Sequence, residues 1–203
     1  MKLKNILKRR SFSLRRRSWR MRPLVAILFL PVFAFGQIKT DYKSCQVGSS
    51  YKDFDHSEFS QFFHTKETKK APYEKGFMRE IKTGPFQEFI TIYVYTDTAW
   101  TIHEATLVLD SEWVHDEKYN PLARDLVQSF LIDFICPGDV EKVRPAAQLI
   151  FKKTPTKDKL ATSVYDVFNG KQTKYSEKLA KCTVSFENFT SGEYSYLRVR
   201  ISD

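Results

Sequence analysis

The histidines and carboxylates of this sequence approach two known chemical motifs without completing either. His103-Glu104 begins like a zinc-protease motif, but Leu107 stands where the second histidine would complete the metal site. Residues 53–64 begin like a calcium-binding loop, but Glu58 occupies the position where the sharp turn needs glycine. The sequence contains no glycine-rich phosphate loop and no nucleophile elbow. It therefore predicts no metal site, no cofactor and no nameable catalytic residue.

An enzyme would need reactive side chains from distant parts of the chain to meet in one cleft. His103 and His115 flank an expected strand at residues 105–114, whose length would hold them too far apart to share one metal ion. A cysteine nucleophile at Cys45 or Cys136 has no supporting local motif. The residues whose convergence would indicate a hydrolase are His103, Asp110, Glu112, His115 and Cys136. Whether the protein is an enzyme stays open, and the sequence favours a non-catalytic role.

A more informative pattern is the alternation of aromatic and basic residues with aliphatic ones. Between residues 193 and 202, tyrosines and arginines alternate with Leu197, Val199 and Ile201, and residues 89–95 repeat the arrangement. Successive side chains of a strand point to opposite faces, so the aliphatic set would face a core. Tyrosine and arginine are favoured at binding hot spots, although a sheet buried on both faces would give the same pattern. The candidate binding residues are Tyr93, Tyr95, Tyr194, Tyr196, Arg198 and Arg200.

Strands are expected on both sides of one long helix. The expected strands are residues 90–96, 105–114 and 148–151, a hairpin over 163–176 and a second hairpin that turns at 190–192. The first hairpin rests on Asn169-Gly170, a pair that suits a tight two-residue turn. The order strands, helix, strands predicts an α+β fold with a mostly antiparallel sheet of about seven or eight strands.

The long helix is expected over residues 120–136. Asn120 and Pro121 are typical of a helix start, and apolar residues then recur at every fourth position up to Phe134. Pro137-Gly138 is a stop signal. The apolar stripe of this amphipathic helix is expected to pack on the sheet.

The segment before this region has no clear period. We expect residues 37–76 to be an irregular segment, with one short helix capped by Asp55 and carrying Phe59, Phe62 and Phe63, followed by a solvated connector. Residues 77–203 are expected to form a single α+β domain, a size for which one core is sufficient.

The positive charge of the chain is concentrated at its start. The net charge is +9, and residues 1–36 hold ten lysines and arginines without one acidic residue. Subtracting those ten from the 33 basic residues leaves 23 against 24 acidic ones, a net charge of −1 for residues 37–203. A nearly neutral body does not favour nucleic acid as a partner, because binding to phosphates needs clustered positive charge.

The basic start is followed by the parts of a secretory signal. Residues 24–35 are an apolar run, too short for a transmembrane helix, and small residues precede Gln37 as at a cleavage site. We expect residues 1–36 to be a cleaved signal peptide and the mature chain to carry no transmembrane anchor. A retained anchor or an intracellular basic arm is the alternative. Arg9-Arg10 raises twin-arginine export, but a general secretory signal, or translation from Met21, fits the leader better.

The expected location is outside the cytosol, either periplasmic or secreted, and a bacterial source fits the leader best. Disulfides form in such compartments, and the candidate members of one are Cys45, Cys136 and Cys182. Three cysteines allow three single pairings, and the sequence does not choose among them. The alternative is that all three cysteines are free and buried.

Three classes of function are compatible with this sequence. The favoured one is an exported, non-catalytic binding or interaction domain, with a protein, a glycan or a lipid as its partner. The alternatives are a carrier that holds an apolar ligand in a curved sheet and a small exported hydrolase. A carrier would show a deep pocket lined by Phe and Leu, whereas a binding domain would expose its Tyr and Arg side chains as one surface. The oligomeric state does not follow from the sequence.

Overall fold

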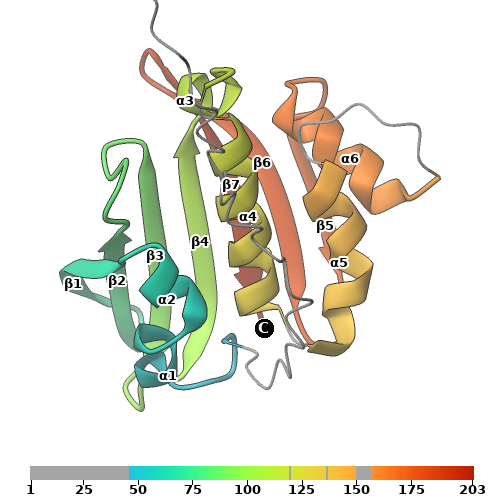
Figure 1. The fold of residues 1–203 in the computed structure, drawn as a ribbon. Helices are drawn as coiled ribbons and strands as arrows, with labels where there is room; N and C mark the ends of the chain where they lie inside the picture. The colour runs from blue at the N-terminus through green and yellow to red at the C-terminus, as the bar shows by residue number, and fades with distance from the viewer. Residues whose placement is uncertain (1–45, 119, 136, 150–156) are drawn as a thin grey trace, which may run out of the picture. The chain divides into compact units, whose positions relative to one another are not determined.

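The centre of the protein is one antiparallel sheet of seven strands. The computed structural model describes residues 46–118, 120–135, 137–149 and 157–203, and the side chains of 137, 138 and 147–149 lie outside that description. The strands are β1 (Lys66–Tyr73), β2 (Gly76–Lys82), β3 (Ile90–Asp97), β4 (Ile102–Asp110), β5 (Lys174–Lys178), β6 (Thr183–Ser191) and β7 (Tyr194–Ser202). Their order across the sheet is β1-β2-β3-β4-β7-β6-β5, so β7 lies inside the sheet between β4 and β6 (Figure 1).

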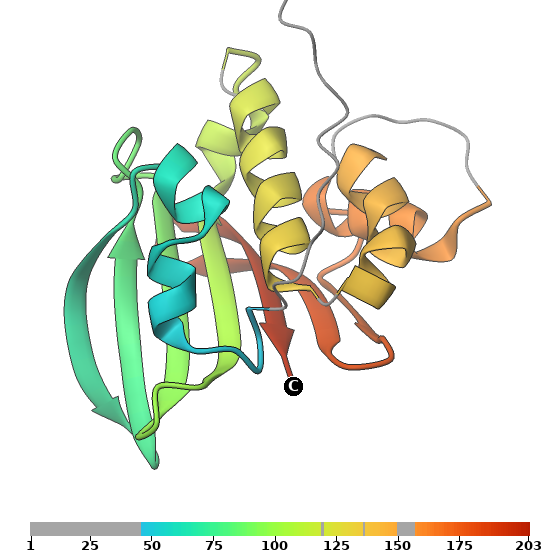
Figure 2. The same ribbon diagram turned by 60° about the horizontal axis from the view of Figure 1, so that its bottom comes forward.

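The helices gather on one side of this sheet. They are α1 (Tyr51–Asp55), α2 (Glu58–Phe62), α3 (Ser111–His115), α4 (Asn120–Phe134), α5 (Pro137–Leu149) and α6 (Lys159–Phe168). Figures 1 and 2 show α1, α2, α4, α5 and α6 over the same face, with α3 at the end of β4. No described helix covers the other face. The α+β class and the antiparallel sheet are therefore as predicted, but the helical layer is larger than the one main helix expected.

The alternation predicted for β3 and β7 is observed. Ile90, Ile92 and Val94 are buried under the helices, whereas Tyr93 and Tyr95, which alternate with them, are half-buried. In β7 the same holds for Leu197, Val199 and Ile201 against the tyrosines and arginines of that strand. Burying these aliphatic side chains contributes roughly 1.5–3 kcal/mol each, which fixes which face of the sheet turns toward the helices.

The long helix α4 lies where its apolar stripe predicts. Leu126, Phe130 and Phe134 are fully buried, and α4 packs on β4 and β7. It ends at Phe134, and α5 begins at Pro137. Pro137-Gly138, expected to end the long helix, therefore also begins α5, because proline suits the first position of a helix.

Three expected strand assignments were wrong. The first half of the hairpin expected over 163–176 is replaced by α6, whereas residues 174–176 of its second half lie in β5. Asp158 caps the start of α6 by accepting the Ala161 amide at 2.8 Å. Its buried residues Leu160, Val164 and Val167 recur at helical rather than strand spacing. Asn169-Gly170 ends this helix, with Gly170 at φ +71°, a left-handed conformation that serves a helix end as well as a tight turn.

The other two strand errors occur at helix boundaries. Of the strand expected at 148–151, the first two residues belong to α5 and the last two lie outside the described residues. The strand expected to run to Val114 ends at Asp110, whose carboxylate accepts the Trp113 amide at 2.9 Å and so begins α3. Because Asp110 caps α3, the apolar residues Trp113 and Val114 lie in a helical turn and not in the expected strand.

The stretch expected as a solvated connector forms the edge strand β1. It pairs with β2 from Lys66 opposite Lys82 to Tyr73 opposite Gly76, with an irregularity between Glu67 and Lys69. Its lysines and Pro72 disfavour the pairing of another strand with its outer edge. In the segment before it, Ser57 rather than Asp55 caps the helix that carries Phe59. The predicted leader and Cys45 lie outside the described residues.

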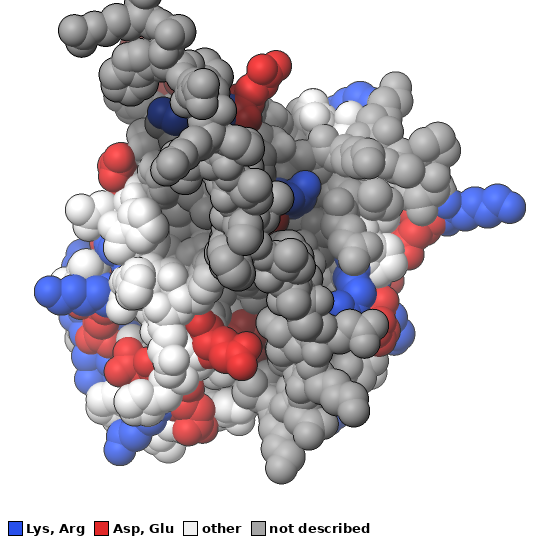
Figure 3. Space-filling model, viewed as in Figure 1, with Lys and Arg blue, Asp and Glu red and all other residues white. Residues whose placement is uncertain are grey.

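The charged side chains of the described chain are mixed in sign. On the helix-covered face, basic and acidic residues lie side by side over β1 and β2 (Figure 3). Among the helices of the described residues, none has the length and apolarity that crossing a membrane requires.

Candidate functional site

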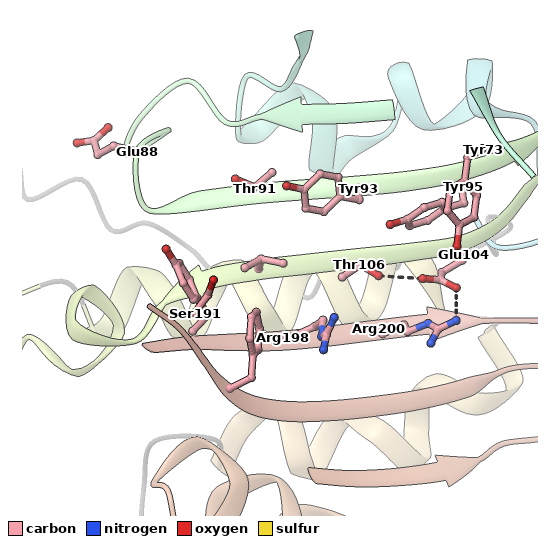
Figure 4. A pocket seen from close by; sticks show the side chains of 13 residues that line it. Tyr73, Glu88, Thr91, Tyr93, Tyr95, Glu104, Thr106, Ser191, Arg198 and Arg200 are labelled. Carbon is pink, nitrogen blue, oxygen red and sulfur yellow. Dashed lines mark hydrogen bonds and ion pairs between the residues drawn. The ribbon is translucent and has the colours of Figure 1, made fainter. Parts of the chain in front are cut away.

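An open groove lies on the face of the sheet that no described helix covers. Its volume is about 580 Å³, and its floor is formed by the outward-facing side chains of β3 and β4, among them Thr91, Tyr93, Thr106 and Val108. The strand register places them in rows, with Tyr93 opposite Thr106 and Thr106 opposite Arg200 of β7. Figure 4 shows these side chains pointing into the same space.

An aromatic pair stands at each end of the groove. Tyr73 and Tyr95 form the first pair, with ring centroids 4.8 Å apart. Phe189 and Tyr196 form the second, stacked at 5.5 Å with an angle of 27° between the rings. Because each ring supports its neighbour, the two flat surfaces are fixed before any ligand arrives, which lowers the entropy cost of binding.

Two arginines, each paired with a glutamate of a neighbouring strand, line the groove between the aromatic ends. The Nε of Arg198 donates to Glu187 at 2.9 Å, and the guanidinium also lies 4.6 Å from the Phe189 ring centre. Arg200 donates to Glu104, and the Thr106 hydroxyl donates to the same carboxylate at 3.2 Å. Both arginines are therefore held in one orientation by a neighbouring strand.

Charges of both signs surround the groove, and Arg198 pairs with Glu187, which lies outside its lining. Its lining contains two arginines, Arg198 and Arg200, and two glutamates, Glu88 and Glu104. Burial raises the pKa of the Tyr93 phenol, and the nearby Glu80 carboxylate raises it further. Burial and then the Glu104 carboxylate raise the pKa of Tyr95 in the same way. Both phenols are thus neutral at physiological pH, and each can donate or accept a hydrogen bond.

Five of the six candidate binding residues line this groove, namely Tyr93, Tyr95, Tyr196, Arg198 and Arg200. Tyr194 does not; it lies at the start of β7 with 62% of its surface exposed. Sequence reasoning missed Tyr73, Glu104 and Phe189. The alternation in β4 contains a signal for Glu104 and Thr106, but Tyr73 lies in a strand that was not expected.

Two of the residues proposed for a hydrolase, His103 and Asp110, lie at opposite ends of β4, and Glu112 and His115 belong to α3, which Asp110 caps. His103 lies near the start of β4, where its Nδ1 is 2.6 Å from Asp203 and its Nε2 is 3.5 Å from Asp97. The hydrogen bond with Asp203 is the main reason that the pKa of His103 is raised. Asp110 caps α3 at the other end of β4, about 24 Å away at 3.4 Å per residue. Cys136 is outside the described residues.

The described cysteine and the side chains that could bind a metal do not indicate a second site. Cys182 is buried beside the turn between β5 and β6, while Cys45 and Cys136 lie outside the described residues, so the disulfide stays a prediction. Within the described residues, no three histidine, cysteine, aspartate or glutamate side chains cluster as metal ligands would.

A second polar cluster is buried under the helices at the β1–β2 end of the sheet. The Arg79 guanidinium lies 4.2 Å from the ring centres of both Tyr51 and Trp100, and its Nη1 donates to Glu67 at 2.7 Å. The Arg79 side chain is 2% exposed, and its Nε and Nη2 find no hydrogen-bond partner among the described residues. Burial, followed by the Glu67 carboxylate, raises the pKa of Tyr51 above its usual range. This cluster anchors α1 to the sheet.

A buried carboxyl group lies on α4 on the same side of the sheet. Asp133 is 8% exposed, and burial raises its pKa to about 6. Hydrogen bonds with Ser57 and Gln46 oppose part of this shift, whereas the nearby Glu58 carboxylate adds to it. The group lies far from the groove in the fold, because the sheet separates the two faces.

Comparisons of this chain with protein-family models, with curated proteins and with solved structures find no match. The function of the groove therefore has to be inferred from the chemistry of its own side chains.

Proposed function

We propose that the protein is an exported, non-catalytic binding domain whose binding site is the groove on the uncovered face of the sheet. The observation that carries this proposal is the arrangement of the tyrosines and arginines around one open groove. Tyrosine and arginine dominate binding energy where they occur at interfaces. Here the aromatic pairs and the ion-paired arginines are already ordered, so little conformational freedom is lost when a ligand binds.

The alternative functions find less support. A carrier of an apolar ligand needs a deep pocket lined by Phe and Leu, whereas the described residues that line the groove include Phe189 and several charged groups but no leucine. A hydrolase needs its reactive groups within hydrogen-bond reach of one point, and His103 and Asp110 stand at opposite ends of β4. The charge balance of the groove also disfavours nucleic acid, because no excess of positive charge is available for phosphates.

The proposal is tested by measuring what the full-length protein binds and whether the groove is required. The probes are an array of oligosaccharides, a library of random 12-residue peptides and phosphatidylcholine vesicles, which represent the three expected partner classes. The groove variant is Tyr196→Thr with Arg198→Met, and the control is Tyr194→Thr, which alters a tyrosine of the same strand outside the groove. Threonine keeps a strand-forming side chain, so folding should be preserved.

We expect the wild type to bind at least one class and the groove variant to lose about tenfold or more in affinity, because each aromatic contact is worth about 0.5–1.5 kcal/mol and the arginine adds to it. The Tyr194→Thr control should bind as the wild type does. Equal binding by the wild type and a folded groove variant would show that the groove is not the site. Failure of the wild type to bind any of the three classes would overturn the proposed function.

A further inference from the structure

The ion pairs in the groove determine which charges a ligand can carry. Arg198 is already bonded to Glu187, and Arg200 to Glu104. An anionic ligand would have to displace a built-in carboxylate and leave it without its partner. A cationic ligand would have to displace an arginine from Glu104 or Glu187, and Glu88 is the one carboxylate of the described lining that belongs to neither pair. The two pairs are therefore suited to a ligand without net charge.

The same pairs are well suited to hydroxyl groups. A hydroxyl can donate to a carboxylate oxygen and accept from a guanidinium or phenol at the same time. The groove offers both partners side by side in Arg200 and Glu104, and Thr91 and Thr106 add hydroxyls to its floor. A ligand with many neutral hydroxyls would satisfy these groups without breaking the ion pairs.

The two aromatic ends indicate the length of such a ligand. Tyr95 pairs with Glu104 and Tyr196 pairs with Asp110, six residues further along β4. At 3.4 Å per residue these two ends are about 20 Å apart along the strand, with Arg200 and Arg198 opposite β4 residues between them. Flat aromatic faces at both ends and hydrogen-bonding groups between them match a chain of sugar rings, each with an apolar face and polar edges.

A peptide fits this surface less well. Extended peptides gain most of their affinity by adding a strand to a sheet edge, where backbone groups are unpaired. The groove instead lies on the face over β3, β4 and β7, whose backbone groups are used by the neighbouring strands. The hydrogen-bonding groups that it presents are side chains, which suits the irregularly placed hydroxyls of a glycan.

We infer that the groove binds a neutral oligosaccharide of several sugar units, stacked on Tyr95 at one end and on Tyr196 at the other. This inference rests on the proposed binding function and specifies its ligand class. It predicts that affinity depends on ligand length, because a short glycan reaches only one aromatic end. It also predicts that neutralising Glu104 and Glu187 strengthens the binding of anionic ligands.

The test uses the full-length protein and titration calorimetry. The neutral probes are cellohexaose, maltohexaose, mannohexaose and the N-acetylglucosamine hexamer, each with its trisaccharide. The anionic probe is hexagalacturonate, and random 12-residue peptides are the third class. We expect binding of at least one neutral hexasaccharide, about tenfold weaker binding of its trisaccharide, and about tenfold losses in Tyr95→Thr and in Tyr196→Thr. The Tyr194→Thr control should show no loss.

A charge variant separates recognition of neutral glycans from recognition of anions. Glu104→Gln with Glu187→Gln keeps the size of both side chains but leaves Arg198 and Arg200 with uncompensated charge. This variant should bind hexagalacturonate at least about tenfold more tightly than the wild type does. Circular dichroism and thermal unfolding would confirm that each variant is folded.

The outcomes distinguish this inference from the proposed function. If the wild type binds the peptides or hexagalacturonate through the groove but none of the neutral hexasaccharides, the glycan inference is overturned and the binding function stands. If it binds a neutral hexasaccharide and the folded tyrosine variants bind equally well, the glycan site lies elsewhere and the inference is overturned. Absence of any binding overturns both.

Discussion

The ion pair between the buried Arg79 and the partly exposed Glu67 leads to a quantitative prediction about stability. A guanidinium that is 2% exposed depends on its carboxylate partner, which is itself 31% exposed. Truncating one partner of a buried ion pair typically costs 3–5 kcal/mol, because the remaining charge is left uncompensated. Water can reach the Glu67 side of the pair, so we expect Glu67→Ala to cost about 3 kcal/mol of unfolding free energy, the lower end of that range.

Removing the positive charge of Arg79 should lower the unfolding free energy less than removing the Glu67 carboxylate that compensates it. Arg79→Met keeps a long unbranched side chain between Tyr51 and Trp100 but removes the charge and the two donors that lack partners among the described residues. The lost ion pair and ring contacts are offset by the removal of a buried charge, so we expect a cost of about 1 kcal/mol. In the Arg79→Met background, Glu67→Ala should then cost less than about 1 kcal/mol, a coupling of roughly 2 kcal/mol between the two positions.

The assay is urea unfolding of the wild type, both single variants and the double variant, with linear extrapolation to water. Equal slopes with denaturant would show that the same surface is exposed in all four proteins. The reasoning is refuted if Arg79→Met destabilises the protein more than Glu67→Ala does, since the ring contacts rather than the charge balance would then dominate. It is equally refuted if the effects of the two single variants simply add.

Three further changes have expected outcomes. The pKa of Asp133, raised by burial from 3.8 to about 6, means that its contribution to stability is fully present below pH 3.8 and is lost as the pH rises through about 6. Asp133→Asn should therefore add up to about 3 kcal/mol at pH 7.5, measured by urea unfolding, and flatten the pH dependence; an unchanged pH profile would contradict this. Gly76→Ala would place a Cβ 1.8 Å from a carbonyl oxygen of β3 and should cost about 3 kcal/mol or more, whereas Gly192→Asn, in open space at φ +64°, should cost little. The imidazole of His103 should titrate above 6.5 by NMR, and Asp203→Asn should lower its pKa; no change would mean that the hydrogen bond is not formed in solution.

The faces of the central strands could be predicted from the sequence because burial imposes a period of two. Ile92 and Val94 alternate with Tyr93 and Tyr95 clearly enough for the sequence alone to assign both faces of β3. The edge strand β1 could not be predicted in this way, because lysines and Pro72 face solvent along most of its length. β1 is a strand because its backbone pairs with that of β2. The local sequence of β1 contains no pattern that would predict this pairing.

The errors among the helices have a local cause. Asn169-Gly170 serves a hairpin turn and a helix end equally well, since both need a left-handed residue at the glycine. The apolar residues of α6 decide between these alternatives, and their spacing of three and four is visible in the sequence. In α5, Pro145 inside the helix conceals the signal, because proline normally indicates an end.

The groove could be predicted only in part, because its composition depends on which strands are neighbours. The alternation in β7 identifies Tyr196, Arg198 and Arg200, but it does not show what stands beside them. Arg200 meets Glu104 across 96 positions of the chain, and this contact exists only because β7 inserts between β4 and β6. That insertion also places Glu187 beside Arg198. The sequence thus predicts a basic, aromatic surface, whereas the topology neutralises its charge. A prediction from the strand alone would favour an anionic ligand, and the folded sheet favours a neutral one.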